Sequence, residues 1–385
     1  MLLFMEQELK IANTTIHNVE KVELEASRDI SVATLKVRLH VKNNDELPDI
    51  KQGDRISWKA GYKRSSESIS KLIEEFSGTI VEISPSRPIE ILARDDMFLL
   101  SLQKVKSDFP SLPLSSYVGR LISYLEKPPV LKIDPSISSL RVKENIYGHS
   151  VRYALWKLTD LKYGCDVYMK GNALYIENQF DKKDKEPEAM FSFYGDIIKD
   201  SIKGKGFKGR KKSQLQKLSN EISVEVVSEN VKTGRISRVK HGKGKNVKIY
   251  YIDNLQTRAL SKKAKEIYNE LTGEGFTGNF TAFGFPSVSI NDVIYLYDPL
   301  DDNKSGMSII NKIVKTYDVS AANYRQVIYP GKFTEPPVKP KKAKKRPASS
   351  GTGVAVEENS KTIIDKIDEK YNGLQLFYQK MKRLF

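Results

Sequence analysis

The chain has 385 residues, a formal net charge of +16 at pH 7 and one cysteine. A single cysteine excludes an internal disulfide framework and a cysteine-based zinc site, and no stretch approaches the roughly 20 apolar residues that cross a bilayer. We therefore expect a protein made in a reducing cytoplasm, without a signal peptide or a membrane partner, whose chain forms roughly two to four domains.

Residues 1–104 are expected to form a first antiparallel β-barrel-like domain. Its clearest strand alternates Leu35, Val37 and Leu39 with polar residues, which is the pattern of a strand with one buried face. Further alternating strands follow, separated by turns that contain glycine and proline. The sequence thus predicts a mainly β fold at this end of the chain.

A helix-containing α+β module is expected over residues 105–189. Ser115 or Ser116 can cap a short helix, and Ser150 can cap a longer helix whose apolar residues share one face. A hairpin follows, with Cys165 on the buried side of its first strand. No histidine is placed by sequence to activate this thiol, so we expect it to pack in the core and not to act as a nucleophile.

Residues 190–332 are expected to form a second antiparallel β-barrel-like domain that includes a helix over residues 255–272. The helix is amphipathic and precedes four strands, so we expect it to lie on the sheet that these strands form. Residues 232–248 resemble the tip of a long hairpin. The glycines of residues 199–217 have GxGxxG spacing, but the parallel βαβ unit of a dinucleotide site is missing, so we expect no cofactor.

The end of the chain predicts a tethered helix. Residues 333–361 are rich in proline, lysine, serine and glycine and are expected to be a flexible basic linker. Residues 362–385 have the pattern of an amphipathic helix, whose apolar face is expected to dock on another subunit or to fold back on its own chain. The residues that we assign to this partner interface are Ile363, Ile367, Tyr371, Phe377, Met381 and Phe385.

The positive charge is concentrated in three short segments. Residues 199–217 hold eight basic residues and one acidic residue, whereas residues 232–248 and 339–346 hold seven and six basic residues and no acidic ones. These segments together carry +20, which leaves the rest of the chain near −4. They can bind nucleic acid or an acidic protein surface. The basic residues that we single out are Lys205, Lys208, Arg210, Lys211, Lys212, Arg235, Arg238, Lys243 and Lys245.

Two parts of the chain repeat a short pattern. Gly53-Asp54 precedes an alternating strand, then Ser77-Gly78 and two further strands, and Asn291-Asp292 precedes the same succession around Ser305-Gly306. An internal repeat of this kind indicates two copies of one structural unit. We therefore expect the two β-barrel-like domains to be similar to one another.

The order and spacing of these motifs resemble phage baseplate hub proteins of the late control D type, and the hub of type VI secretion spikes is similar. In the first domain the resemblance rests on Gly53-Asp54, Gly61-Tyr62, Phe76-Ser77-Gly78, Ile83 and Asp95-Asp96-Met97-Phe98-Leu99-Leu100. In the second domain it rests on Phe280, Gly284, Asp292, Asp298-Pro299, Gly306 and Tyr324-Arg325-Gln326. It covers about residues 8–332, and the basic segments and the C-terminal residues depart from it.

The resemblance implies a homotrimer whose six barrels surround a central channel. Such a ring would join a six-fold tail tube to a three-fold central spike in the tail or baseplate of a virion and let DNA or an effector pass. The implied partners are the tail tube protein, the central spike protein and, for the C-terminal helix, other baseplate proteins. A channel that passes DNA should not bind it specifically, so we expect the basic segments to face neighbouring proteins. The sequence leaves open whether the assembly belongs to a phage, a tailocin or a secretion system.

A nucleic-acid-binding protein is the alternative, with the same three basic segments making salt-dependent contacts to phosphate. Stacking on bases would need aromatic residues among the charges, and only Phe207 lies there. That composition favours protein contacts.

An enzyme is a further class, because some hubs carry a cell-wall hydrolase. The histidines His17, His40, His149 and His241 have neither zinc-ligand spacing nor a cysteine partner. The adjacent acids Asp95 and Asp96 end a strand, where such residues more often cap a turn than catalyse. We therefore expect no catalytic residues and no metal site.

Overall fold

The structure is a computed structural model that describes most of the chain up to residue 334. The described residues are 3–12, 14–28, 32–40, 49–64, 72–84, 87–170, 173–180, 186–205, 221–230, 233–252, 255, 257–272, 275–298 and 305–334. The linker predicted over residues 333–361, apart from its first two residues, and the helix predicted over residues 362–385 lie outside this part of the chain. Both stay predictions.

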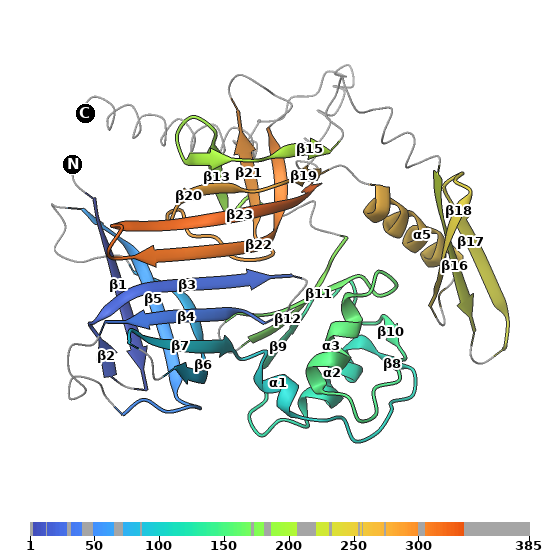
Figure 1. Ribbon diagram of the computed structural model, residues 1–385. Coiled ribbons are helices and arrows are strands. Elements are labelled where there is room, and N and C mark those ends of the chain that lie inside the picture. Colours follow the sequence, from blue (N-terminus) through green and yellow to red (C-terminus); the bar gives the residue numbers. More distant parts are fainter. Residues whose placement is uncertain are drawn as a thin grey trace, which may run out of the picture.

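Strands dominate the described residues, and the helices are few (Figure 1). The predicted fold class is confirmed: the chain is mainly β, with β-barrel-like units and a smaller α+β part. In Figure 1 the two β-rich units lie one above the other, and the α+β part lies beside them. None of the described helices is long and apolar enough to cross a membrane.

The first β-rich unit is an antiparallel sheet that curls around its own core. Its strands are β1 Leu3–Ile11, β2 Thr14–Ile16, β3 Val19–Ser27, β4 Thr34–Leu39, β5 Arg55–Arg64, β6 Ile73–Ser84 and β7 Ile89–Asp95. They pair in the order β3-β4-β7-β6-β5-β1-β2. Leu35, Val37 and Leu39 are at most 1% exposed, which confirms the strand predicted from their alternation.

The α+β module follows in the chain and has its own core, which contains Cys165. Its helices and strands are short, with two to nine residues each. The elements are α1 Leu99–Leu102, β8 Leu112–Pro113, α2 Leu114–Ile122, β9 Val130–Ile133, β10 Arg141–Val142, α3 Val151–Trp156, the 3₁₀ helix η2 Lys157–Thr159, β11 Cys165–Lys170 and β12 Ala173–Asn178.

The two predicted helix caps of this module have different outcomes. The Oγ of Ser150 accepts a hydrogen bond from the N–H of Tyr153 at 3.2 Å, so the predicted cap of α3 is confirmed. α2 begins directly after Pro113 and has no side-chain cap, so the cap predicted at Ser115 or Ser116 is wrong. The reason is that other backbone carbonyls, such as that of Leu140, already accept from the first N–H groups of α2.

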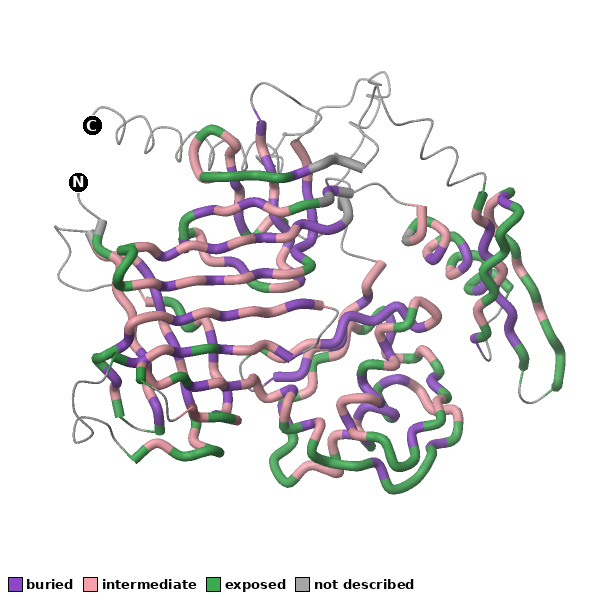
Figure 2. The backbone as a smooth tube through the Cα atoms, in the orientation of Figure 1, coloured by how far each residue is buried: buried purple, intermediate pink, exposed green. Residues whose placement is uncertain are grey.

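The second β-rich unit shares its sheet with the first. Its strands are β13 Ala189–Ser192, β14 Ile197–Asp200, β15 Lys203–Lys205, β19 Gly275–Thr277, β20 Phe280–Phe283, β21 Val293–Tyr297, β22 Gly306–Asp318 and β23 Asn323–Thr334. The order β14-β20-β23-β22 continues directly into β3 and β4, so the two units form one 15-stranded sheet (Figure 1). Figure 2 shows buried and accessible residues alternating along these strands, as expected when one face covers a core.

A helix and three strands between β15 and β19 form a separate two-layer unit, in which the helix covers a three-stranded sheet. α5 Thr257–Thr272 packs on a sheet in which β16 Ile222–Glu229 lies between β17 Ile236–His241 and β18 Asn246–Tyr251. The predicted helix is therefore confirmed, but its predicted place on the four following strands is wrong. The hairpin tip predicted at residues 232–248 is correct only at its start, where β16 and β17 form an antiparallel hairpin, because the rest of the segment includes β17 itself and leads to β18, which also pairs with β16. Periodicity shows which face of a helix is apolar, but not which sheet will cover it.

Candidate assembly surfaces

The two β-rich units have the same strand order and the same order along the chain. Six strands of the first unit are arranged β3-β4-β7-β6-β5-β1, and six of the second are arranged β14-β20-β23-β22-β21-β13. One pairing differs, since β1 runs antiparallel to β5 whereas β13 runs parallel to β21. The structure thus contains the repeat that the sequence motifs indicated.

The first copy of the repeated turn lies before β5. Gly53 has a positive φ of 93°, and its N–H donates to the carbonyl of Ile80 at 2.9 Å. The N–H of Ile80 donates in return to the carbonyl of Asp54 at 2.9 Å. The Asp54 carboxylate accepts from the N–H of Lys51, three residues earlier, at 2.8 Å. These bonds fix the start of β5 against β6.

The second copy, before β21, makes the same three hydrogen bonds. Asn291 has a positive φ of 66°, and its N–H donates to the carbonyl of Ile310 at 3.1 Å. The N–H of Ile310 donates to the carbonyl of Asp292 at 3.0 Å. The Asp292 carboxylate accepts from the N–H of Ser289, again three residues earlier, at 2.7 Å. Glycine and asparagine are the residues that most readily adopt this backbone conformation, which explains both sequence motifs.

Bulges at matching places fix the correspondence residue by residue. The pairing of β6 with β7 shifts after Ile80, and that of β22 with β23 shifts on both sides of Ile310. The pairing of β3 with β4 shifts after Val19, and that of β14 with β20 shifts after Ile197. Bulges of this kind are specific structural features, so Ile80 corresponds to Ile310 and Val19 to Ile197.

The joint between the repeats is formed by β3 and β22. Residues 21–27 pair with residues 312–318 in seven antiparallel pairs. The Lys312 ammonium group forms an ion pair with the Glu25 carboxylate at the edge of this joint. Both side chains are at least one third exposed, so the pair adds at most about 1 kcal/mol and the backbone ladder holds the joint.

A buried ion pair ties β22 to β6 beneath the joint. The side chains of Lys315 and Glu75 are each 2% exposed, and their charged groups are in direct contact. The Lys315 ammonium group also donates to Ser287 Oγ at 2.7 Å, and the Tyr324 hydroxyl donates to Glu75 Oε1 at 2.8 Å. Burial lowers the pKa of Lys315 and raises the pKa of Tyr324, and Glu75 opposes the first shift and adds to the second. Each buried charge therefore has a charged partner and a hydrogen bond.

Aromatic residues of both repeats share one core at this place. The ring of Tyr324 lies 6.2 Å from Trp58, 5.6 Å from Tyr62 and 5.8 Å from Tyr317, measured between ring centroids. The Tyr62 hydroxyl donates to the carbonyl of Tyr324 at 2.7 Å. Tyr317 and Tyr324 of the second unit thus belong to the core of the first unit.

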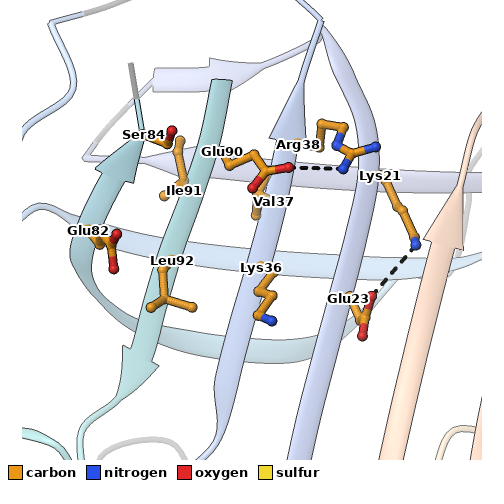
Figure 3. Close-up of a pocket in the computed structure, with 10 residues that line it drawn as sticks. All are labelled: Lys21, Glu23, Lys36, Val37, Arg38, Glu82, Ser84, Glu90, Ile91 and Leu92. Carbon is orange, nitrogen blue, oxygen red and sulfur yellow. Dashed lines mark hydrogen bonds and ion pairs between the residues drawn. The ribbon is translucent and has the colours of Figure 1, made fainter. Parts of the chain in front are cut away.

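The face of the shared sheet that points away from this core is charged. Figure 3 shows a shallow hollow on it, with a cavity volume of about 270 Å³, where Arg38 forms an ion pair with Glu90 at 2.9 Å and Lys21 with Glu23 at 3.6 Å. A ligand pocket is normally deeper and mostly apolar. The charged lining is balanced, with three basic and three acidic side chains: Lys21, Lys36, Arg38, Glu23, Glu82 and Glu90.

The two acids that end β7 have separate structural partners. Asp95 Oδ2 accepts from the N–H of Ala33 at 2.9 Å, and the carbonyl of Asp95 accepts from the N–H of Phe98 at 3.0 Å. The Asp96 carboxylate forms an ion pair with Arg55 of β5. Asp95 therefore closes the turn before α1, as predicted from its position at a strand end.

The first basic segment is described only in part. Lys205 ends β15, and Lys199 lies in β14. The other basic residues singled out in this segment lie outside the described part of the chain, as does all of residues 339–346; they are Lys208, Arg210, Lys211 and Lys212. The partner interface predicted from the C-terminal helix also lies outside it; its residues are Ile363, Ile367, Tyr371, Phe377, Met381 and Phe385.

The second basic segment lies on the β16–β18 sheet, away from the joint (Figure 1). Arg235 precedes β17, and Lys243 and Lys245 lie between β17 and β18; all three are exposed. Arg238 of β17 is also exposed and forms an ion pair with Glu225 at 3.6 Å. The segment is thus part of a folded sheet, and its contacts with a partner stay a prediction.

The cysteine is packed as predicted. Cys165 is fully buried, and burial raises the pKa of its thiol to about 12. No cluster of three or more potential metal ligands occurs among the described residues.

Sequence reasoning missed the residues of the joint. A local signal existed for Lys315 alone: it alternates with Ile313 and Tyr317 and so occupies the buried face of β22. A lysine at such a position needs a buried acidic partner, but the sequence does not say which acid supplies it.

Comparison with solved structures identifies the fold. The chain aligns with a tail protein from Neisseria meningitidis MC58 at a TM-score of 0.59 and 9% identity, over 86% of this chain and 97% of that one. It aligns with the 43 kDa tail protein of prophage MuSo2 from Shewanella oneidensis at a TM-score of 0.53 and 12% identity, over 86% and 99%. It aligns with the prophage tail protein gp18 from Listeria monocytogenes EGD-e at a TM-score of 0.52 and 9% identity, over 84% and 94%.

No protein-family model and no curated protein sequence matches the chain. The likeness is one of fold, and it extends over nearly the whole length of each of these three tail proteins. The chain therefore has the fold of tail proteins, and the resemblance to tail hub proteins read from the sequence is confirmed at the level of the fold.

Proposed function

We propose that this protein is a structural tail hub, a homotrimeric ring that joins a six-fold tail tube to a three-fold central spike. The repeat carries this proposal. Two similar units per chain, which we assign to residues 1–104 and 190–332, give six units in a trimer. Six units can face a six-fold tube, while three chains can face a three-fold spike. Resolving this difference of symmetry is geometric work and needs no catalytic residue.

The side-by-side joint of the two units supports a ring. β3 and β22 extend one sheet across both units, so a third and a fourth unit can be added in the same way by the next chain. We assign the charged face of the shared sheet to the channel. Its balanced charges around the hollow of Figure 3 would give DNA phosphates no net attraction, which suits a passage for DNA.

The proposal includes partners and a place. A tail tube protein would dock on one side of the ring and a central spike protein on the other, in the tail or baseplate of a virion. The C-terminal residues predicted as an amphipathic helix would bind other baseplate proteins, and the second basic segment would face a neighbouring protein. The protein is made in the cytoplasm of the bacterial host and has no enzymatic role in this scheme.

Light scattering and electron microscopy of the purified full chain test the proposal. We expect three times the mass of one chain, and end-on particle images with three-fold symmetry in which six similar units surround an opening. A chain that stays monomeric at high concentration and with its tube and spike proteins present would contradict the ring.

A further inference from the structure

We infer that neighbouring chains of the ring are joined by a copy of the joint that β3 and β22 make within one chain. The copy is formed by β14 and β15 of one chain and the end of β6 of the next. This inference rests on the proposed ring. It adds the strands, the register and the charges with which a second copy of this chain closes that ring.

The repeat supplies the argument. β3 corresponds to β14 with its continuation β15, and β22 corresponds to β6, since the two units have the same strand order and matching bulges. β15 continues the register of β14, because Asp200 pairs with Phe280 and Lys203 with Thr277, without an inserted residue. Each chain therefore has two strands of the β3 kind and two of the β22 kind. The joint within the chain uses β3 and β22, and it leaves β14 with β15 and the end of β6 as the unused halves of a second joint.

The unused halves are sheet edges in the part of the chain that the structure describes. β14 is the end strand of the shared sheet and has β20 as its neighbour. The pairing of β6 with β5 ends at Thr79, so residues 82–84 have β7 as their neighbouring strand. Six strands lie between these two edges in the order of the sheet, and neither β14 nor β15 pairs with β6 among the described residues. A second copy presents the missing edge in the required direction.

At this edge of β6, the side chain of Gln52 makes the hydrogen bond that a strand from the next chain would make. In the joint within the chain, the carbonyl of Asn311 accepts from the backbone N–H of Arg28 at 2.9 Å. The corresponding carbonyl of Val81 accepts instead from the side-chain amide of Gln52 at 2.7 Å. Gln52 is exposed, so a backbone N–H from another chain can replace its amide while the number of hydrogen bonds is kept.

The register predicts complementary charges across the new joint. Glu82 corresponds to Lys312, and Lys203 corresponds to Glu25, so the ion pair of the internal joint recurs with its signs exchanged. Lys205 takes the position directly opposite Glu82. Lysines on an edge strand discourage pairing with arbitrary strands, and an acidic residue on the correct partner selects it.

The internal joint shows where a disulfide can bridge such strands. Arg28 and Asn311 form a hydrogen-bonded pair. Three residues further along, Glu25 and Val314 therefore form a non-hydrogen-bonded pair, whose Cα atoms lie about 4.5 Å apart, within reach of a disulfide. The corresponding pair in the new joint is Ser84 of one chain and Lys203 of the next.

Cysteine pairs at these positions test the inference in the full chain. The test variant is Ser84→Cys with Lys203→Cys, and the matched control is Val314→Cys with Glu25→Cys. Burial raises the pKa of the native Cys165 thiol to about 12, so this thiol stays unreactive at pH 8. On oxidation we expect the control to form a disulfide within one chain, and the test variant to form covalent dimers and trimers that reducing agent dissolves.

Each outcome separates this inference from the ring itself. A gel ladder that stops at three chains supports both the joint and the trimer. A ladder that continues beyond three supports the joint, but shows that the ring does not close at three. A trimer by light scattering that does not cross-link, while the control does, overturns the joint and leaves the ring. Monomers without cross-links overturn both.

Charge reversal gives a second test that does not depend on cysteines. Glu82→Lys should weaken trimer formation at least tenfold, because it places a third positive charge among the two lysines of β15. Adding Lys203→Glu to it should restore most of the loss. Equal trimer formation by the original chain and Glu82→Lys would overturn the inference.

Discussion

Asp95 is a buried carboxyl group whose ionisation opposes folding. Burial raises its pKa to about 7; Asp96 adds to the rise, and the N–H of Ala33 and the charge of Arg152 oppose it. The folded state therefore keeps a proton that the unfolded chain releases above about pH 4. Because the folded state binds more protons in this window, the free energy of unfolding falls as the pH rises from about 4 to about 7.

Asp95→Asn should remove this dependence. We expect the variant to be more stable than the original chain at pH 8, by roughly 2–4 kcal/mol, and to keep less than half of that advantage at pH 5. Urea unfolding at the two pH values measures the difference. The control is Asp96→Asn, which breaks the ion pair with Arg55 and should lower stability at both pH values. An advantage of Asp95→Asn that is the same at both pH values would contradict this account.

Glu75 and Lys315 should depend on each other much more than Glu25 and Lys312 do. Glu75→Gln leaves a buried lysine without a charged partner and should cost about 3–5 kcal/mol. Adding Lys315→Met should recover most of this loss, since no charge then remains buried. The exposed counterpart, Glu25→Gln, should cost less than about 1 kcal/mol. Denaturant unfolding of the three variants gives these values, and equal costs for Glu75→Gln and Glu25→Gln would refute the distinction.

At the scale of the element, the helix α5 should stabilise its own sheet and not the shared one. Leu260 of α5 is fully buried among residues of β16, so Leu260→Ala should cost about 2–5 kcal/mol. Hydrogen exchange should then become faster in residues 222–229 and stay unchanged in residues 306–318. Lys262→Ala on the exposed side of the helix is the control and should change neither. Faster exchange in both regions would contradict the prediction that the helix stabilises its own sheet alone.

The elements themselves were largely predictable, and their neighbours were not. The alternation of apolar and polar residues predicted β4, and the helical spacing of apolar residues predicted α5. Ser150 predicted the start of α3. The sheet beneath α5 could not be predicted, because an apolar face fits any apolar surface of similar size. The start of α2 was missed because carbonyls of a distant segment, not a local side chain, accept from its first N–H groups.

At the scale of the whole molecule, the net charge of +16 should not make this protein a strong DNA binder. Arg238 forms an ion pair, and the hollow on the shared sheet is balanced in charge. We expect weak binding of duplex DNA at about 0.15 M salt, with no preference for sequence. Fluorescence titration at low and high salt measures it. Tight binding that falls steeply with salt, and that Arg235→Gln with Lys243→Gln weakens, would favour the nucleic-acid-binding alternative.

The repeat and the kind of fold could be read from short motifs, whereas the joint could not. Gly53-Asp54 and Asn291-Asp292 are local signals, because their turns demand particular residues. The pairing of β3 with β22 joins strands nearly 290 residues apart in the chain, and such a contact leaves no local pattern. The partner interface proposed for the C-terminal residues stays a prediction.

The seven pairs between β3 and β22 also determine how the molecule carries force. Hydrogen bonds of an antiparallel ladder run across the strands, so a pull along the strands loads all of them at once, whereas a pull across the strands opens them one after another. In the proposed hub, a thrust along the strand direction would load all seven pairs at once, so the joint would resist it best in that direction. Optical-tweezer pulling along and across β22 would then give two very different rupture forces.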